Sequence, residues 1–241
     1  ARLDKSFARA VKSGRIEADA AEKARAAITL TLDMNDFADR DLVVEAAPEI
    51  ESLKLDLFGK LDSIVKPEGI LATNTSSIPV IKMANATKRP DKVVGVHFFN
   101  PVPVLPLVEI VVSLVTSEET VAAVTDYASN TLGKKTIRAG DRAGFIVNAL
   151  LIPYMVSAIR MLESGFASAE DIDDGMVNGC AHPMGPLRLT DTVGLDVTLA
   201  VAESLYAEFR EPHYAPPPLL QRMVDAGMLG RKSGKGFYSY S

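Results

Sequence analysis

The apolar pattern of this sequence changes near residue 140, and that change restricts the possible folds more than any other feature. Before it, short apolar runs alternate with stretches of helical spacing, which is typical of an α/β sheet with largely parallel strands. After Gly140 the strand-like runs stop and helical spacing continues. The sequence therefore predicts an α/β domain over residues 1–139 and an all-helical domain over residues 140–241.

Periodicity also predicts the individual elements. The expected helices are 1–14, 18–27, 51–65, 78–84, 117–132, 145–164, 195–209 and 219–226. The expected strands are 28–32, 41–46, 70–72, 93–99, 107–112 and 135–138. One more helix is expected after Ser168, because Ser168 and Asp171 have the spacing of a capping box.

Composition argues against several classes of function. The 241 residues carry a net charge of −5, from 26 Lys and Arg against 31 Asp and Glu, which disfavours a dedicated nucleic-acid-binding protein. Cys180 is the only cysteine, so we expect no disulfides and a reducing, cytoplasmic location. The three histidines lack the spacing of metal ligands. The most apolar helical stretch is too short to cross a bilayer, so neither a metal nor a membrane partner is expected.

His97 and Glu109 are the first candidates for chemistry. Each lies on an expected strand, and the turn Asn100-Pro101-Val102-Pro103 separates the two strands. If the strands are neighbours, the carboxylate can fix the tautomer of the imidazole and raise its basicity, as a general base requires. On spacing alone the more frequent alternative is a core histidine beside an unrelated surface glutamate.

Two further candidates are polar residues beside apolar segments. The turn Asn74-Thr75-Ser76-Ser77 follows an expected strand, where α/β sheets bind ligands; alternatively, Ser76 or Ser77 caps the next helix. Asn148 lies within an apolar helical run, so it either makes a structural hydrogen bond or points into a cleft.

Basic residues recur at helical spacing along the first expected helix. They are Arg2, Lys5, Arg9 and Lys12. Such a stripe can hold the phosphates of a large anionic substrate, although it is more often a solvated helix face.

Several motifs together resemble one enzyme family. They are Asp41-Leu42-Val43-Val44-Glu45-Ala46, Asn74-Thr75-Ser76-Ser77, His97-Phe98-Phe99-Asn100-Pro101-Val102-Pro103, Leu107-Val108-Glu109, Gly144-Phe145-Ile146-Val147-Asn148, Pro183-Met184-Gly185-Pro186 and Gly234-Lys235-Gly236-Phe237-Tyr238. Their order over essentially the whole chain resembles the (S)-3-hydroxyacyl-CoA dehydrogenases, in particular the short bacterial 3-hydroxybutyryl-CoA dehydrogenases.

The resemblance implies a Rossmann-type NAD-binding domain, a helical domain for substrate and dimer contacts, and oxidation of an acyl-CoA in fatty acid metabolism (β-oxidation). It implies that His97 is the catalytic base, Glu109 its partner, and that Ser76 and Asn148 contact the substrate. The cofactor contacts implied by the motifs are Glu49, Lys54, Ser76, Asn100 and Lys232. The implied coenzyme A contacts on the first helix are Ser6 and Lys12. A homodimer is implied as well.

The sequence departs from the family pattern in two places. The glycine-rich dinucleotide fingerprint is absent, so we expect the first strand, the glycine loop and the second strand, roughly fifty residues of a typical member, to precede Ala1 in a longer protein. Ala149 stands where the family commonly has Arg. Two rival functions are a dehydrogenase of a free 3-hydroxy acid such as gulonate and a catalytically silent structural relative.

Overall fold

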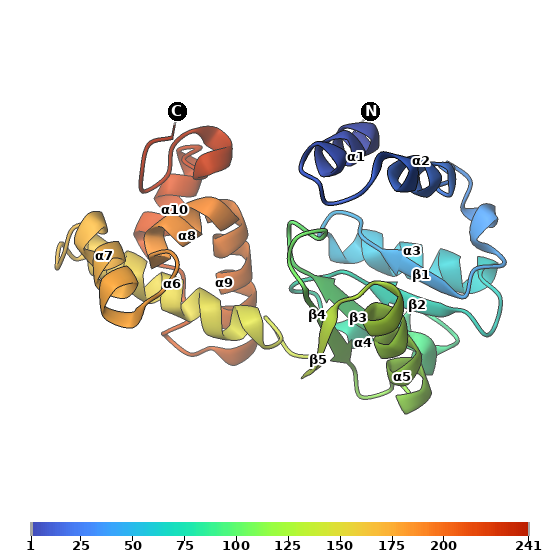
Figure 1. The fold of residues 1–241 in the computed structure, drawn as a ribbon. Coiled ribbons are helices and arrows are strands. Elements are labelled where there is room, and N and C mark those ends of the chain that lie inside the picture. Colours follow the sequence, from blue (N-terminus) through green and yellow to red (C-terminus); the bar gives the residue numbers. More distant parts are fainter. Residues whose placement is uncertain (1, 241) are drawn as a thin grey trace.

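The computed structural model describes residues 2–240, and Figure 1 shows them as a sheet domain joined to a helical domain. The strands of the sheet domain are β1 (Leu42–Glu45), β2 (Ile70–Thr73), β3 (Val93–Phe98), β4 (Leu107–Val112) and β5 (Lys135–Gly140). Its helices are α1 (Arg2–Lys12), α2 (Ala18–Ala26), α3 (Glu51–Ile64), α4 (Val80–Asn85) and α5 (Glu118–Asp126). A sheet domain followed by a helical domain, expected because the strand-like runs stop after Gly140, is therefore present.

The five strands form one sheet in the order β1-β2-β3-β4-β5. Three of its four pairings are parallel, and only β3 and β4 run antiparallel. The expectation of a largely parallel sheet is confirmed. The antiparallel pairing of β3 and β4 places His97 directly opposite Glu109.

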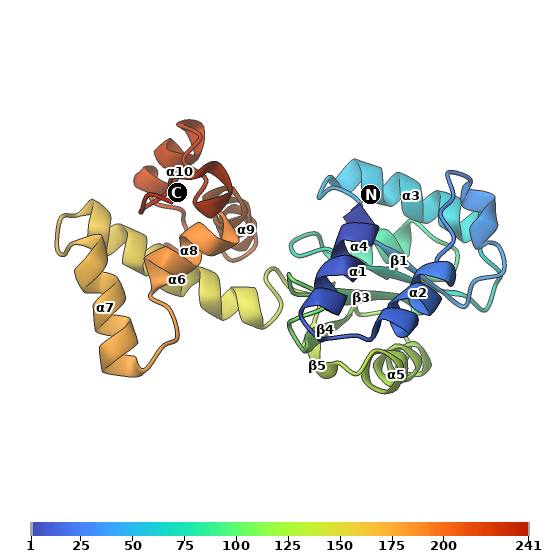
Figure 2. The same cartoon turned by 45° about the horizontal axis from the view of Figure 1, so that its top comes forward.

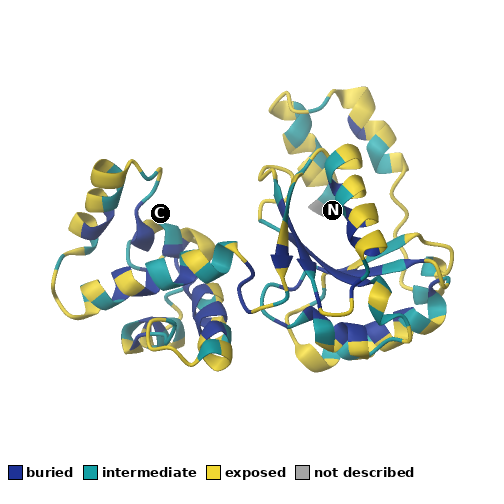
Figure 3. Ribbon diagram, turned by 90° about the horizontal axis from the view of Figure 1, so that it is seen from below, coloured by how far each residue is buried: buried dark blue, intermediate teal, exposed yellow. Residues whose placement is uncertain are grey.

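Helices cover both faces of the sheet. On one face Phe58 of α3 and Met83 of α4 pack in the same cluster as Leu71 of β2. On the other face Val121 of α5 packs with Val94 of β3. These side chains are buried, and Figure 3 shows buried residues along the sheet between exposed helix surfaces. Successive strand residues point to opposite faces, so the short apolar runs of the sequence fill both layers.

The helical domain follows residue 146. Its helices are α6 (Val147–Glu163), α7 (Ala169–Cys180), α8 (Pro186–Val193), α9 (Leu195–Phe209) and α10 (Pro218–Asp225). Ser168 caps α7 by accepting a hydrogen bond from the Asp171 amide, as expected. Helix α8 was not predicted from the sequence. Its first amides bind the buried carboxylate of Asp173 on α7, so its stabilisation comes from tertiary structure, not local pattern. No helix among residues 2–240 is long and apolar enough to cross a membrane.

One expected strand is wrong. Residues 28–32 alternate like a strand in the sequence but form no strand in the structure. Leu30 is 76% exposed and Leu32 is fully exposed, and neither pairs with a strand among the described residues. An alternating pattern produces a strand only where a neighbouring strand completes its hydrogen bonds. The segment instead leads away from the α1–α2 hairpin, which Figures 1 and 2 show beside the sheet.

The connection between the domains is held at several points. The carboxylate of Asp141 accepts the amides of Val80 and Ile81, the first residues of α4, at 2.7 Å each. Glu208 of α9 accepts the Ala143 amide at 2.8 Å. Gly144 has a φ of +74°, and a Cβ there would lie 2.8 Å from the backbone nitrogen of Ala149, so this turn requires glycine.

Candidate functional site

The two strands bring His97 and Glu109 together. Nδ1 of His97 lies 2.7 Å from Oε2 of Glu109. His97 is 6% exposed and Glu109 is fully buried, so the contact between Nδ1 and Oε2 is shielded from water. The alternative that the two residues are unrelated is wrong. Their contact follows from the register, because the residues are direct partners across β3 and β4.

The second ring nitrogen of His97 is free. Within residues 2–240 Nε2 has no hydrogen-bond partner, and no buried side-chain nitrogen or oxygen there lacks one. Nε2 must therefore reach the surface. The ring is fixed by edge contacts with Phe99 and Phe145, at centroid distances of 4.6 and 5.4 Å. With the Nδ1–H group donating its hydrogen bond to Oε2 of Glu109, this geometry leaves Nε2 as the proton acceptor.

The other oxygen of Glu109 binds the start of the helical domain. Oε1 accepts the amides of Ile146 at 3.1 Å and Val147 at 3.0 Å. These amides lie at the N-terminus of α6, where the helix dipole stabilises a negative charge. Asn148 is the next residue, is partly buried and makes no side-chain hydrogen bond within the described chain. The structural alternative for Asn148 therefore has no support, and its amide is free for a ligand.

The turn after β2 lies beside the His97 strand. Oδ1 of Asn74 accepts the Phe98 amide at 2.9 Å, which joins the turn to the end of β3. The hydroxyl of Ser76 has no hydrogen-bond partner among residues 2–240. The alternative that Ser76 or Ser77 caps the next helix is wrong, because Pro79 is the cap residue of α4 and Asp141 holds its first amides.

Glu49 anchors this turn. Its Oε1 accepts hydrogen bonds from the Thr75 hydroxyl, the Ser76 and Ser77 amides at 3.0 Å each, and the Ser77 hydroxyl at 2.9 Å. Burial raises the pKa of Glu49, but the Thr75 and Ser76 hydrogen bonds, the Lys54 charge and the Ser77 hydroxyl outweigh it. The pKa of Glu49 therefore lies below its usual 4.5. About a third of the side chain remains exposed, so Glu49 also faces the surface.

Lys54 lies beneath Glu49 rather than at the surface. Its side chain is 1% exposed, and its Nζ lies 2.7 and 2.9 Å from the two carboxylate oxygens of Glu45. It also donates to the Ala47 carbonyl at 3.2 Å and lies 3.3 Å from Glu49. These partners occupy the ammonium group, so the direct cofactor contact expected for Lys54 has no support in this arrangement.

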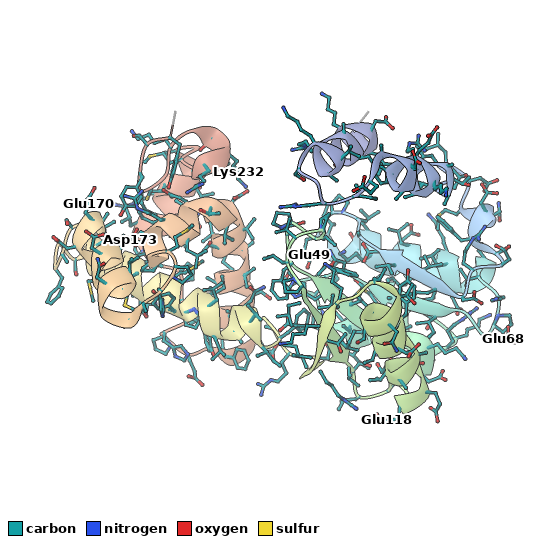
Figure 4. The ribbon with its side chains drawn as sticks, viewed as in Figure 1. Glu49, Glu68, Glu118, Glu170, Asp173 and Lys232 are labelled. Carbon is teal, nitrogen blue, oxygen red and sulfur yellow. The ribbon has the colours of Figure 1, made fainter. Side chains whose placement is uncertain are left out.

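The remaining expected site residues lie apart from one another. Asn100 is exposed at the end of the β3 strand. The ammonium of Lys232 binds both carboxylate oxygens of Asp196 on α9, and Figure 4 shows Lys232 and Glu49 on different domains. The structure therefore does not place Lys232 with the turn that carries Ser76.

The first helix carries Ser6 and Lys12 on exposed positions, together with Lys5 and Arg9. Lys5, Arg9 and Lys12 form no ion pair within the described chain, whereas Arg25 of α2 binds Asp4 at 2.9 Å and joins the two helices. The side chain of Arg2, expected on the same stripe, lies outside the described residues. Lys5, Arg9 and Lys12 thus form an exposed cationic surface on α1.

Three contributors to the site were not predicted from the sequence. Glu45 is a buried carboxylate on β1, Asp141 holds α4, and Phe145 packs against the His97 ring. A charged residue within the apolar run 42–46 was the signal for Glu45, since buried charges need partners. No group of three His, Cys, Asp or Glu residues among those described could hold a metal ion.

Comparison with known proteins shows the family of the chain. The family described as "3-hydroxyacyl-CoA dehydrogenase, NAD binding domain" matches residues 1–142, and "3-hydroxyacyl-CoA dehydrogenase, C-terminal domain" matches residues 144–240. The 3-hydroxybutyryl-CoA dehydrogenase of Mycobacterium tuberculosis is 55% identical over 240 residues, which are 99% of this chain and 84% of that protein.

Solved structures show the same relationship. The crystal structure of FadB2 from M. tuberculosis has a TM-score of 0.98 at 55% identity, covering 100% of this chain and 85% of that one. The crystal structure of (S)-3-hydroxybutyryl-CoA dehydrogenase from Ralstonia eutropha has a TM-score of 0.93 at 45% identity, covering 99% and 84%. The sheet domain is therefore a Rossmann-type NAD-binding domain, and the chain belongs to the 3-hydroxyacyl-CoA dehydrogenase family of NAD-dependent oxidoreductases.

Proposed function

We propose that the chain interconverts (S)-3-hydroxyacyl-CoA and 3-oxoacyl-CoA, with short-chain 3-hydroxybutyryl-CoA as its substrate, and that His97 and Glu109 are its acid–base pair. One observation carries the proposal: His97 Nδ1 lies 2.7 Å from a fully buried carboxylate while Nε2 stays accessible. The similarity to 3-hydroxybutyryl-CoA dehydrogenases supports the choice of substrate.

In the oxidative direction Nε2 of His97 accepts the proton of the substrate's 3-hydroxyl group. Glu109 stabilises the imidazolium that forms, and the two amides at the start of α6 hold its other oxygen in place. The free hydroxyl of Ser76 and the free amide of Asn148 orient the substrate oxygens. In the reductive direction the protonated His97 returns its proton to the forming alkoxide.

The residues around the Ser76 turn fit the nicotinamide end of the cofactor. Glu49 is a partly exposed carboxylate beside the free hydroxyl of Ser76, and Asn100 is exposed at the end of the neighbouring strand. We assign Glu49, Ser76 and Asn100 to direct contact, and Lys54 and Lys232 to support through Glu49 and Asp196. NAD held by these residues would supply the hydride acceptor for oxidation at the 3-carbon of the substrate.

The basic stripe of α1 provides the coenzyme A contact in this proposal. Lys5, Arg9 and Lys12 are exposed cations without ion-pair partners among residues 2–240, and Ser6 adds a hydroxyl on the same helix. Phosphate groups bind such cations by charge-assisted hydrogen bonds. This stripe favours a coenzyme A ester over a free 3-hydroxy acid.

The substrate class is tested with the protein made from its complete reading frame. The loss of NADH absorbance is measured with acetoacetyl-CoA and with free acetoacetate, and the gain of NADH absorbance is measured in the oxidative direction with gulonate and NAD. We expect rapid turnover of the coenzyme A ester and none of the free acids. Turnover of gulonate with no turnover of acetoacetyl-CoA would overturn the proposal.

We further infer a homodimer in the cytoplasm, formed through the helical domain, which we take to begin at residue 140. Large apolar side chains are exposed on that domain: Leu150 is 71% and Phe166 is 79% exposed. A hollow of about 570 Å³ beside Leu150 is lined mainly by apolar side chains of α6 and of the segment 182–184 that precedes α8. Light scattering should give twice the monomer mass; a monomer at micromolar concentration would refute this inference. The free Cys180 supports a reducing location.

A further inference from the structure

We propose that Glu45 and Lys54 form a buried positioning pair that holds Glu49 and the turn 75–77 in place, and thereby sets the position of Ser76. The inference deepens the proposed function and rests on it, because it concerns how a substrate-contacting residue is held. Neither Glu45 nor the buried state of Lys54 has a role in the acid–base chemistry described above. Both charged groups are nevertheless almost fully buried, at 3% and 1% side-chain exposure.

The pair first fixes the loop between β1 and α3. Oε1 of Glu45 accepts the Ala47 amide, and Nζ of Lys54 donates to the Ala47 carbonyl at 3.2 Å. Both backbone polar groups of Ala47 are therefore held by the pair. Glu49 lies two residues further along this loop, so its backbone position is set from the same point.

Two hydrogen-bond routes then lead from Glu45 to the Ser76 turn. In the first, Lys54 lies 3.3 Å from Oε2 of Glu49, whose Oε1 accepts the amides of Ser76 and Ser77. In the second, Oε2 of Glu45 accepts the Thr73 hydroxyl at 2.7 Å, and Oγ1 of Thr73 accepts the Thr75 amide at 3.2 Å. Three consecutive amides of the turn thus depend on the pair.

The cost of burying two charges indicates that the pair has a role beyond stability. Replacing a buried ion pair by uncharged residues of similar volume is often neutral or stabilising. Here the ammonium and carboxylate do more than pair with each other, because every contact they add leads to Ala47, Glu49 or Thr73. Their geometry is that of a support for the turn.

The test compares a double variant with a matched control. Glu45→Gln/Lys54→Met removes both buried charges, while the glutamine oxygen still accepts a hydrogen bond from either the Ala47 amide or the Thr73 hydroxyl. Glu51→Gln is the control, because it removes an ion pair of 2.7 Å between Glu51 of α3 and Lys82 of α4 that is almost half exposed. Both variants are made in the protein expressed from its complete reading frame.

The first readout is amide hydrogen exchange, which needs no enzymatic activity. We expect the amides of Thr75, Ser76 and Ser77 to exchange at least about tenfold faster in the double variant, as loss of hydrogen bonds to charged groups predicts. Exchange in β3 and β4 should stay unchanged, and the Glu51→Gln control should match the wild type. Unchanged exchange in the turn would overturn the proposal.

The second readout is the division of the effect between kcat and KM. With acetoacetyl-CoA we expect kcat to fall at least about tenfold while KM for the ester stays within about twofold, because the stripe on α1 is untouched. A loosened turn with unchanged kcat would also overturn the proposal. A wild-type protein without turnover would refute the proposed function instead, while the exchange comparison would still test the pair. If the double variant does not fold, Thr73→Val replaces it, with faster exchange expected at Thr75.

Discussion

Replacing Glu109 with glutamine changes one atom in the centre of the site and should nearly abolish activity. In the wild type Oε2 of Glu109 faces Nδ1 of His97 at 2.7 Å, and Oε1 faces the amides of Ile146 and Val147. Both oxygens accept hydrogen bonds. A glutamine has only one side-chain oxygen, so its amide nitrogen must face either the imidazole or the two helix amides.

The orientation in which the glutamine NH₂ group faces the imidazole is the lower in energy. If the NH₂ group faced α6, three N–H donors would meet without an acceptor, so the NH₂ group turns to His97. It then donates to Nδ1, which moves the imidazole proton to Nε2. That tautomer cannot accept a proton from the substrate, and the buried charge that stabilises the imidazolium is gone.

The expected losses of activity and of stability follow from the same geometry. A misplaced tautomer in a Ser-His-Asp triad costs about 10⁴-fold in kcat, and we expect Glu109→Gln to lower kcat at least about 10³-fold. The bonds to α6 persist, so the loss of stability is that of one charge-assisted hydrogen bond, about 1.5–3 kcal/mol.

The assay measures NADH loss with saturating acetoacetyl-CoA, alongside thermal unfolding. Glu118→Gln is the control, because it removes the exposed ion pair with Arg138 and should leave both values unchanged. A Glu109→Gln variant that is folded and retains more than about a tenth of the wild-type kcat would refute the tautomer argument.

Three further predictions concern the turn, the connection between domains and the α6 amide. Glu49→Gln should lower the melting temperature near neutral pH. The pKa of Glu49 in the folded protein lies below its usual 4.5, so the stabilisation by its charge is complete above pH 4.5 and is lost as the pH falls through the folded pKa. A difference in melting temperature between the wild type and the variant that does not shrink in acid would contradict this. Gly144→Ala should cost about 1–3 kcal/mol in chemical unfolding, because φ is +74° and the new Cβ meets the Ala149 nitrogen; an unchanged midpoint would count against it. Asn148→Ala should change stability by less than about 0.5 kcal/mol yet lower kcat about 100-fold; a large loss of stability would restore the structural interpretation of Asn148.

Most of the fold could be predicted from local patterns. Strands β1 to β4 lie within or beside apolar runs, because strands buried on both faces need such runs. Strand β5 is an edge strand of mixed polarity, so its signal was weaker. The segment 28–32 failed for the complementary reason: its pattern is strand-like, but Leu30 and Leu32 lie exposed without a strand partner among the described residues. Helix α8 was missed because its start depends on Asp173, a residue of another helix.

The site was predictable in part. The His97–Glu109 pair needed only the assumption that two successive strands are neighbours, which the register satisfies. The second contact of Glu109, with the start of α6, depends on how the two domains meet and has no local signal. For Lys54 the resemblance implied only a cofactor contact; its burial depends on Glu45 of β1, whose carboxylate pairs with its ammonium group.

The central claim is that Nε2 of His97 exchanges a proton with the 3-oxygen of an acyl-CoA. Its most direct test is the rate of NADH oxidation by the His97→Ala variant with saturating acetoacetyl-CoA, beside the wild type and with folding checked by circular dichroism. We predict rapid turnover in the wild type and a loss of about 10²- to 10⁴-fold in the variant, the range for general acid–base catalysis. A folded His97→Ala variant with the wild-type rate would contradict the claim.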